Sequence, residues 1–349
     1  MNLACGRVTD MKLRTASGEA ALKLLKDKLI ELDWEFKFDN YAKDFSGVEF
    51  RQGISRPKAS VVIITYRYLP VIAENLRLLE KQKQEADFEI ILVNNGMPAD
   101  EAESLAQTSD KAVHLTGNTG AYVARNFGAL FASAPVLIFL DDDGLPEPGF
   151  VSGHLRAHEE FDIVSARGVV KPKTESAFNA FAGHYDFGPD PFPRFVDLEG
   201  NASYKAETFY RLGGWNDAIR FGHGGVELAY RISKITPVAG KQAYVPWPVI
   251  LHDYARDEGH LIAKRKKQDM SRRYLETMHP DIREYLSIWE QLKGKSDLLT
   301  RKETGEKRRD DPASILNLAE FYRRRGQDEK AREYLMKYQV MKLDKAGQS

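Results

Sequence analysis

Residues 136–143 read Val-Leu-Ile-Phe-Leu-Asp-Asp-Asp, an apolar run that stops abruptly at three consecutive carboxylates. A short, continuous apolar run is typical of a strand that is buried on both faces of a parallel sheet. In such sheets, ligands bind outside the carboxyl ends of the strands. This stretch therefore predicts an α/β fold, and it also indicates the sheet edge at which chemistry should be sought.

Further apolar runs precede this one, and segments with helical spacing separate them. The other expected strands are Ser60–Thr65, Phe88–Val93 and Ala112–Leu115. Helices are expected between and after them, from Ile72 to Leu79, from Ala99 to Thr108 and from Gly120 to Ala132. Strands that alternate with helices predict a mostly parallel sheet that is flanked by helices.

The rest of the chain is expected to form extensions around this α/β domain. Residues 1–57 are expected to form an N-terminal lead-in with a helix over 17–38. The main domain is expected over 58–255, followed by a helical segment over 256–300. Residues 301–349 begin as a charged linker and continue with a pattern that resembles one tetratricopeptide repeat, a helical hairpin of about 34 residues. A generic helical hairpin is the alternative for this last segment.

Composition and charge exclude several classes of protein. The chain has 349 residues with 51 Lys+Arg and 51 Asp+Glu, so its formal net charge is zero, which argues against nucleic-acid binding. The single cysteine, Cys5, cannot form an intrachain disulfide and fits a reducing compartment. No apolar run approaches the roughly 20 residues that span a bilayer, and Met1–Asp10 has no signal-peptide core. We therefore expect a cytoplasmic protein, with at most peripheral contact at the inner face of the membrane.

The carboxylates Asp141, Asp142 and Asp143 are the first candidate site. Like charges this close repel one another, and their pKa values rise unless a cation compensates. A hard divalent ion with oxygen ligands and substrate phosphates would provide that compensation. A solvated turn is the alternative for an acidic triplet alone, but the placement after a buried strand favours a metal site.

Five segments, in order over roughly residues 58–255, resemble those of a family 2 glycosyltransferase with the GT-A fold. They are Val61–Arg67, Ile90–Gly96, the stretch from Asn118 to Gly128, Phe139–Asp143 as the Asp-x-Asp motif, and the stretch from Gly200 to Trp215 on the acceptor side. The resemblance implies a transferase that uses a nucleotide-diphosphate sugar. Asp141 and Asp143 would bind Mn²⁺ or Mg²⁺, with His252, which follows an apolar strand, as a further ligand.

The resemblance also implies a nucleotide site at the same edge. Its candidate residues are Thr65, Tyr66, Arg67, Asn94, Asn95, Asn118, Gly120, Arg125, Asp141 and Asp142. Asn94 stands where the family usually has an acid that contacts uracil, and its amide can both accept and donate a hydrogen bond. Arg125 could brace the phosphates or pair with an acid of the metal motif. A plain turn at 94–96 and a surface arginine are the alternatives.

The segment expected to hold the catalytic base departs from the family pattern. Inverting transfer needs a base that takes a proton from the acceptor hydroxyl. The family's Glu-Asp pair falls on Gly224-Gly225 in this chain, and Glu227 matches the second acid. Glu227 could act as the base, His223 could replace it because imidazole titrates near neutral pH, or no base remains.

These observations lead to two alternative functions. The first is an inverting, metal-dependent glycosyltransferase that moves a sugar, preferably from a UDP-sugar, to a glycan, a lipid-linked or another hydroxyl acceptor. The second is a degenerate donor-binding scaffold that recruits a protein partner through its C-terminal hairpin. A basic run at Lys264–Lys267 could hold an anionic acceptor or a lipid surface, and a solvated helix face is the alternative.

Overall fold

The computed structural model describes residues 14–50, 56–236, 240–302, 312–324 and 326–346. The expectations for Cys5, for the first ten residues and for most of the charged linker, 303–311, lie outside these ranges. Within them, no helix is both long and apolar enough to cross a bilayer.

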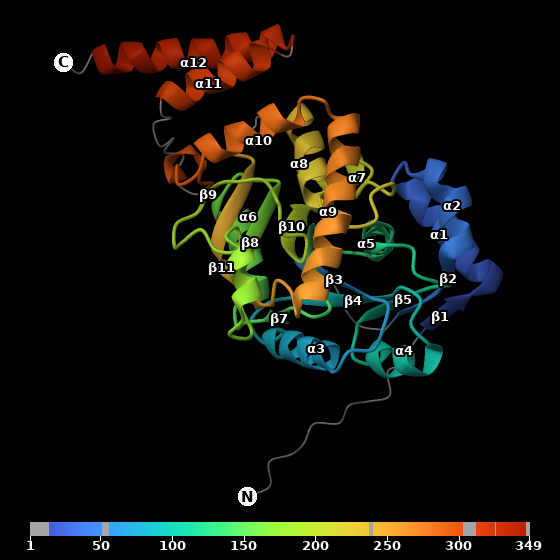
Figure 1. The fold of residues 1–349 in the computed structure, drawn as a ribbon. Helices are drawn as coiled ribbons and strands as arrows, with labels where there is room; N and C mark the ends of the chain where they lie inside the picture. The colour runs from blue at the N-terminus through green and yellow to red at the C-terminus, as the bar shows by residue number, and fades with distance from the viewer. Residues whose placement is uncertain (1–13, 51–55, 237–239, 303–311, 325, 347–349) are drawn as a thin grey trace, which may run out of the picture.

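One mixed sheet runs through the centre of the main domain (Figure 1). Its strands are β1 (Arg14–Ser17), β2 (Phe45–Phe50), β3 (Ala59–Thr65), β4 (Phe88–Asn94), β5 (Lys111–Leu115), β6 (Val136–Asp141), β7 (Leu145–Pro146), β8 (Ser165–Lys171), β9 (Phe192–Pro193), β10 (Asn201–Lys205) and β11 (Gln242–Leu251). Their order is β1-β2-β5-β4-β3-β6-β10-β8-β11-β7, with β9 beside β11. The pairs β5–β4, β4–β3, β3–β6 and β8–β11 are parallel, and the other pairs are antiparallel. The sheet is thus parallel at the strands that the sequence predicted.

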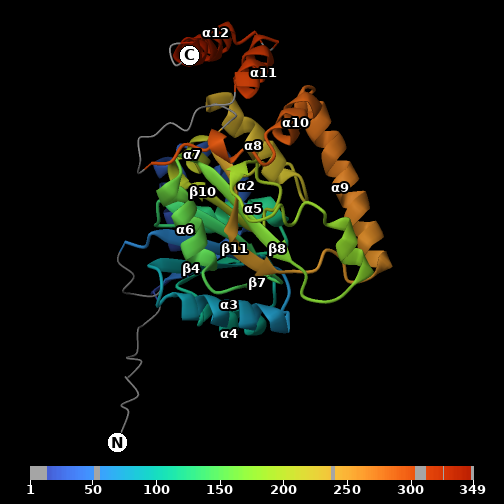
Figure 2. The same cartoon turned by 90° about the vertical axis from the view of Figure 1, so that its left-hand side faces the viewer.

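Most of the described helices lie on the two faces of this sheet, and the last two stand away from it (Figures 1 and 2). The described helices are α1 (Gly18–Glu31), α2 (Phe38–Asp44), α3 (Pro70–Gln82), α4 (Ala99–Ala106), α5 (Ala121–Leu130), α6 (Phe150–Glu160), α7 (Ala206–Arg211), α8 (Gly224–Ile235), α9 (Glu258–Met278), α10 (Ile282–Gln291), α11 (Pro312–Arg323) and α12 (Asp328–Ala346). Buried side chains of α3, α4 and α6 share one apolar cluster with the central strands. Those of α1, α5 and α7 share a second cluster on the opposite face.

The apolar runs of the central strands are continuous because both of their faces are buried. In β3, Val62 packs in the cluster that contains α1 and α5, whereas Val61 and Ile63 pack in the cluster that contains α3 and α6. Successive side chains of a strand point to opposite faces, so a strand between two helical layers needs apolar residues at every position. The expected α/β fold, with helices on both faces of the sheet, is confirmed.

The N-terminal segment differs from the expected single helix and irregular lead-in. The helix expected over 17–38 ends at Glu31, and a second helix, α2, begins at Phe38. Residues 45–50 form β2, which pairs antiparallel with β5 and extends the sheet. This strand is short and is interrupted by polar residues, so it has no periodic signal that the sequence analysis could detect.

The C-terminal helices α11 and α12 form a hairpin. The rings of Tyr322 and Tyr334 stack between the two helices with centroids 5.5 Å apart. The buried residues Ile315 and Ala319 join an apolar cluster that includes Trp289 of α10 and residues of α8. The hairpin therefore packs on the main domain through α8 and α10, at the top of Figure 1. Its likeness to a tetratricopeptide repeat, and the domain boundaries, stay predictions.

The contact of α5 with the sheet generates a stability prediction. A Cβ atom on Gly128 would lie 2.3 Å from Val62 Cγ1 and 3.0 Å from Val93 Cγ2, both on buried strands. Although alanine favours helices over glycine by about 1 kcal/mol, this overlap is not removable without moving the sheet. We expect Gly128→Ala to lower the free energy of unfolding by about 1–3 kcal/mol in urea titrations.

Gly259, in the first turn of α9, provides the matched control. A Cβ atom there would meet only Asp257 Oδ1, at 3.4 Å. We expect Gly259→Ala to leave stability unchanged or raise it by up to about 1 kcal/mol. Equal effects of the two substitutions would contradict the close packing of α5 on β3.

Candidate active site at the carboxyl edge of the sheet

The parallel register brings the predicted polar residues to one edge of the sheet. Thr65 ends β3 and lies opposite Asn94, which ends β4. Asp141 ends β6, opposite Ile64 of β3. Asp143 follows two residues later, and His252 directly follows β11, the strand that pairs with β7. Residues that are far apart in the sequence therefore meet where an α/β sheet binds its ligands.

Asp141, Asp143 and His252 form a group that could hold a metal ion. One ligand atom from each residue lies within 4.8 Å of the others, and all three side chains are partly exposed. His252 Nε2 lies 3.2 Å from Asp143 Oδ1. Two carboxylates and an imidazole suit Mn²⁺, and carboxylates with added phosphate oxygens also suit Mg²⁺. The residues present thus fit the divalent ion expected from the sequence.

The neighbouring carboxylates of Asp142 and Asp143 have pKa values that are shifted in opposite directions. Burial opposes ionisation of Asp143, but the hydrogen bond and charge of His252 outweigh it and lower its pKa to about 2. Burial raises the pKa of Asp142 to about 7, and the charge of Asp143 adds to the rise. The nearby Thr65 hydroxyl and the charge of Arg67 lower this pKa and offset part of the rise. This crowding of negative charge is what a bound cation would relieve.

Arg125 supplies part of the compensating charge. It extends from α5, and its Nη2 donates to Asp141 Oδ1 over 2.6 Å. Its side chain is only 7% exposed, whereas that of Asp141 is 36% exposed. Of the two roles predicted for Arg125, pairing with an acid of the metal motif is the one that this geometry contains.

The Asp141–Gly144 loop is held by Asn75, which the sequence analysis missed, and is packed against Gly200, which it assigned only to the acceptor-side segment. Asn75 of α3 is fully buried, and its Nδ2 donates to the carbonyls of Asp141 and Gly144 over 3.0 and 2.5 Å. Gly200 faces Asp141 so closely that a Cβ atom there would lie 2.0 Å from Asp141 Oδ2. An asparagine on an amphipathic helix carries no sequence signal of such a role, because its partners are backbone atoms 66 and 69 residues away.

The segment after β3 presents polar and aromatic groups at the same edge. Thr65 is buried, and its Oγ1 donates to the Arg67 carbonyl over 2.8 Å. Tyr66 is 46% exposed, and the Arg67 guanidinium lies 4.9 Å from the centre of its ring. Thr65 thus shapes the turn, while Tyr66 and Arg67 are accessible to a ligand.

The asparagines predicted to bind the nucleotide shape two loops. Asn94 Oδ1 accepts from the Met97 N–H over 2.6 Å, and its Nδ2 donates to the Met97 carbonyl over 3.2 Å. Asn95 Oδ1 accepts from the Thr119 N–H over 2.9 Å, and its Nδ2 lies 3.3 Å from the Gly120 carbonyl. Asn118 Oδ1 accepts from the Gly120 N–H. The turn alternative for Asn94 thus fits better than contact with a base, because the backbone occupies both ends of its amide.

Glu227 lies in a buried ion pair. Its side chain is 1% exposed, and Arg231 Nε and Nη2 donate to its two oxygens over 2.7–3.0 Å. His279 Nε2 lies 3.4 Å away. Burial opposes ionisation of Glu227, but His279 and Arg231 outweigh it and lower its pKa. Because Arg231 also donates to the Leu212 and Gly214 carbonyls, this geometry favours a structural role over the predicted catalytic one.

His223 precedes α8 with a left-handed backbone, at φ +61°. Burial is the main cause that lowers its pKa, and Arg272 adds to the effect against the charge of Glu199. Its Nδ1 is buried without a hydrogen-bond partner among the described residues. The lowered pKa favours the neutral imidazole.

The predicted basic run on α9 divides between the site and solvent. Lys264 is partly buried, and its Nζ donates to the Tyr254 carbonyl over 2.8 Å. Burial lowers its pKa, although the charges of Asp141 and Asp143 oppose the shift. The following three basic residues, 265–267, are exposed. Lys264 thus interacts electrostatically with Asp141 and Asp143, whereas the other three basic residues face solvent.

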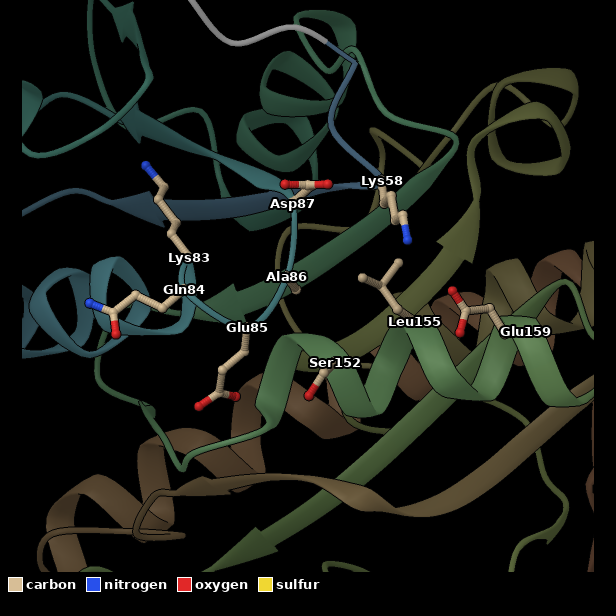
Figure 3. Close-up of a pocket in the computed structure, with 9 residues that line it drawn as sticks. All are labelled: Lys58, Lys83, Gln84, Glu85, Ala86, Asp87, Ser152, Leu155 and Glu159. Atoms are coloured by element: carbon tan, nitrogen blue, oxygen red, sulfur yellow. The ribbon is translucent and has the colours of Figure 1, made fainter.

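A pocket of about 300 Å³ lies elsewhere, at the amino ends of the central strands (Figure 3). Lys58 precedes β3 and Asp87 precedes β4, and both line this pocket with residues of α6. It contains none of the residues predicted to act on a ligand. The candidate site is thus defined by its side chains at the opposite edge and not by this cavity.

Comparison with known families agrees with this arrangement. Residues 60–221 match the profile of the family described as Glycosyl transferase family 2. The chain contains a family 2 glycosyltransferase domain. The matched segment includes every strand that ends at the candidate site except β11, which brings His252.

Two curated relatives also resemble the glycosyltransferase domain. "Uncharacterized glycosyltransferase YwdF" of Bacillus subtilis (strain 168) is 33% identical over 109 residues, which cover 31% of this chain and 40% of that protein. N-acetylgalactosaminyltransferase 6 of Drosophila melanogaster is 27% identical over 250 residues, 62% of this chain and 37% of that protein. The chain thus spans about two fifths of the length of these relatives.

Solved structures with a similar chain course include two complexes with Mn²⁺. The mannosyltransferase PcManGT from Pyrobaculum calidifontis, with GDP-Man and Mn²⁺, is 16% identical with a TM-score of 0.47, over 92% of this chain and 97% of that one. GalNAc-T7 with UDP, GalNAc and Mn²⁺ is 17% identical with a TM-score of 0.46, over 59% of this chain and 45% of that one.

The Glu227–Arg231 pair generates a pH-dependent prediction. Removing one partner of a buried ion pair leaves the other charge uncompensated, so we expect Glu227→Gln to cost about 3 kcal/mol of stability at pH 7. Because the folded state lowers the pKa of Glu227, this contribution is complete above the unfolded pKa of about 4.3 and is lost as the pH falls through the folded value. Urea titrations of the wild type and of Glu227→Gln should show a smaller difference in the free energy of unfolding at pH 4 than at pH 7. An equal difference at both values would contradict the ion pair.

Proposed function

We propose that this protein is a metal-dependent glycosyltransferase that acts on a nucleotide-diphosphate sugar. The observation that carries the proposal is the meeting of Asp141, Asp143 and His252 at the carboxyl edge of a family 2 domain. A domain of this family that retains a fitting ligand set has the parts that donor binding requires. The whole protein's activity is part of the proposal, since the chain covers only part of its curated relatives.

Asp141, Asp143 and His252 would hold Mn²⁺ or Mg²⁺. When bound, the ion would stabilise negative charge on the departing nucleoside diphosphate. Arg125 fixes the orientation of Asp141 and adds positive charge beside it. Asn75 keeps the loop between Asp141 and Gly144 in one conformation, so that the two acidic ligands stay on the same side of the sheet.

The donor would lie between the metal group and the segment Thr65–Arg67. Tyr66 and Arg67 are exposed there and could stack on a base or contact phosphate, whereas Asn95 and Asn118 fix the neighbouring loop. We propose a UDP-sugar as the donor and a glycan, lipid-linked or other hydroxyl acceptor, with inversion at the anomeric carbon. Peripheral membrane contact and a cytoplasmic location remain part of this proposal.

The degenerate scaffold is the second candidate. The observation in its favour is the pair Gly224-Gly225 at the position of the family's Glu-Asp base. In that case the domain would bind a donor without transferring it, and the C-terminal hairpin would recruit a protein partner. Turnover separates the two candidates, because both predict nucleotide binding.

Calorimetric binding of UDP, with GDP and CDP as comparators, tests the donor site. Binding of UDP should require Mn²⁺. Asp143→Ala should weaken this binding by at least about 10²-fold, because loss of a group that only supports a metal ligand already lowers metal affinity by about 10–100-fold. Asp87→Asn, which changes a carboxylate at the opposite edge of the sheet, is the matched control and should bind as the wild type does. Metal-independent binding, or equal binding by Asp143→Ala, would contradict the metal assignment.

A further inference from the structure

A carboxylate from another part of the chain lies at the start of α8, where this sequence has two glycines. Glu199 precedes β10. Its Oε1 accepts from the Gly225 N–H over 3.0 Å and from the Tyr122 hydroxyl over 2.9 Å. The Tyr122 hydroxyl in turn accepts from the Gly224 N–H over 2.9 Å. Glu199 thus occupies the helix N-terminus that would otherwise carry its own acidic residues.

The two glycines and Glu199 depend on each other sterically. A Cβ atom on Gly224 would lie 2.3 Å from the ring of Tyr122. A Cβ atom on Gly225 would lie 2.5 Å from the Val196 carbonyl and 3.3 Å from Glu199 Cγ. A side chain at Gly224 would therefore overlap Tyr122, and one at Gly225 would overlap the Val196 carbonyl and crowd Glu199. A carboxylate thus lies at the start of α8, although the helix itself begins with two glycines.

Glu199 is also close to the metal group. It directly precedes Gly200, where a Cβ atom would overlap Asp141 Oδ2 at 2.0 Å. The ring centre of its partner Tyr122 lies 5.7 Å from the guanidinium of Arg125. This guanidinium pairs with Asp141. The negative charge of Glu199 also acts on Lys264 and His223, which approach from α9 and from the start of α8. Glu199 therefore lies beside the metal group and within electrostatic range of these two side chains.

One oxygen of Glu199 is left for a substrate. Within the described ranges, the hydrogen bonds to its side chain all go to Oε1, and the residue is half-buried. Glu227 differs, because Arg231 contacts both of its oxygens in the interior. We propose that Glu199 is the catalytic base of the transfer reaction, an inference that rests on the proposed glycosyltransferase function.

The proposed reaction is a displacement at the anomeric carbon of the donor sugar. Glu199 Oε2 takes the proton of the acceptor hydroxyl, and the oxygen lone pair of that hydroxyl forms the new bond to the anomeric carbon. The bond between the anomeric carbon and the donor phosphate oxygen breaks, and its electron pair leaves with the nucleoside diphosphate. Tyr122 and the Gly225 N–H hold Oε1 meanwhile, so that the carboxylate keeps its orientation.

Glu199→Gln tests this role with little structural change. The amide oxygen of glutamine can still accept from Tyr122 and Gly225, but the amide nitrogen cannot take a proton. The assay measures UDP or GDP released from UDP-glucose, UDP-N-acetylglucosamine, UDP-N-acetylgalactosamine and GDP-mannose with Mn²⁺, with water and simple sugars as acceptors. We expect Glu199→Gln to lower the release rate by about 10²–10⁴-fold while calorimetric binding of UDP with Mn²⁺ and the melting temperature stay at wild-type values.

Glu159→Gln, an exposed glutamate beside the pocket at the opposite edge of the sheet, is the matched control and should match the wild type in every readout. Wild-type release rates in Glu199→Gln would overturn the base assignment alone. Loss of UDP binding in that variant would overturn it too, since Glu199 would then serve the donor site. Failure of the proposed function is seen in the wild-type protein itself, as absence of UDP binding or of release from every donor.

Discussion

Three carboxylates at the end of one buried strand require positive charge beside them, and the rest of the site follows from that constraint. Arg125 of α5 supplies positive charge to Asp141, and His252, at the end of β11, lies 3.2 Å from Asp143. These partners come from elements on both sides of β6, so the site exists only when the sheet is complete. Asn75 and Gly200 then fix the loop by backbone contact and close approach. The remaining negative charge is what suits the site to a divalent ion.

The sequence predicted the parts of this arrangement that rest on periodicity and chain order. Continuous apolar runs identified β3, β4 and β6 because both faces of those strands are buried. The resemblance to family 2 glycosyltransferases then implied that His252 joins Asp141 and Asp143 as a metal ligand. The strand β2 was not predicted because it is short and partly polar. The role of Asn75 was not predicted because its partners are backbone atoms of a distant loop. Contacts of this kind have no local signature.

The catalytic base shows a different limit of sequence alignment. A gapless match compares positions along α8 and finds glycine at both places of the expected pair. In three dimensions, Glu199 contacts the same helix N-terminus from the loop that precedes β10. Glu227, which the alignment matched to the family's second acid, is held in the interior by Arg231, and Arg231 ties α8 to the turn at Leu212–Gly214. An acidic residue within the aligned motif, such as Glu227, can thus be structural. An acidic residue outside the motif, such as Glu199, is the one that we propose acts on the substrate.

The central claim is that Asp141, Asp143 and His252 hold one divalent ion against a nucleoside diphosphate. A crystal structure of the protein with Mn²⁺ and UDP, with anomalous data at the manganese edge, tests it most directly. We expect one strong anomalous peak among these three side chains, with the diphosphate completing the coordination and the base beside Thr65–Arg67. A peak elsewhere, or UDP bound at this edge with no metal among the three residues, would contradict it.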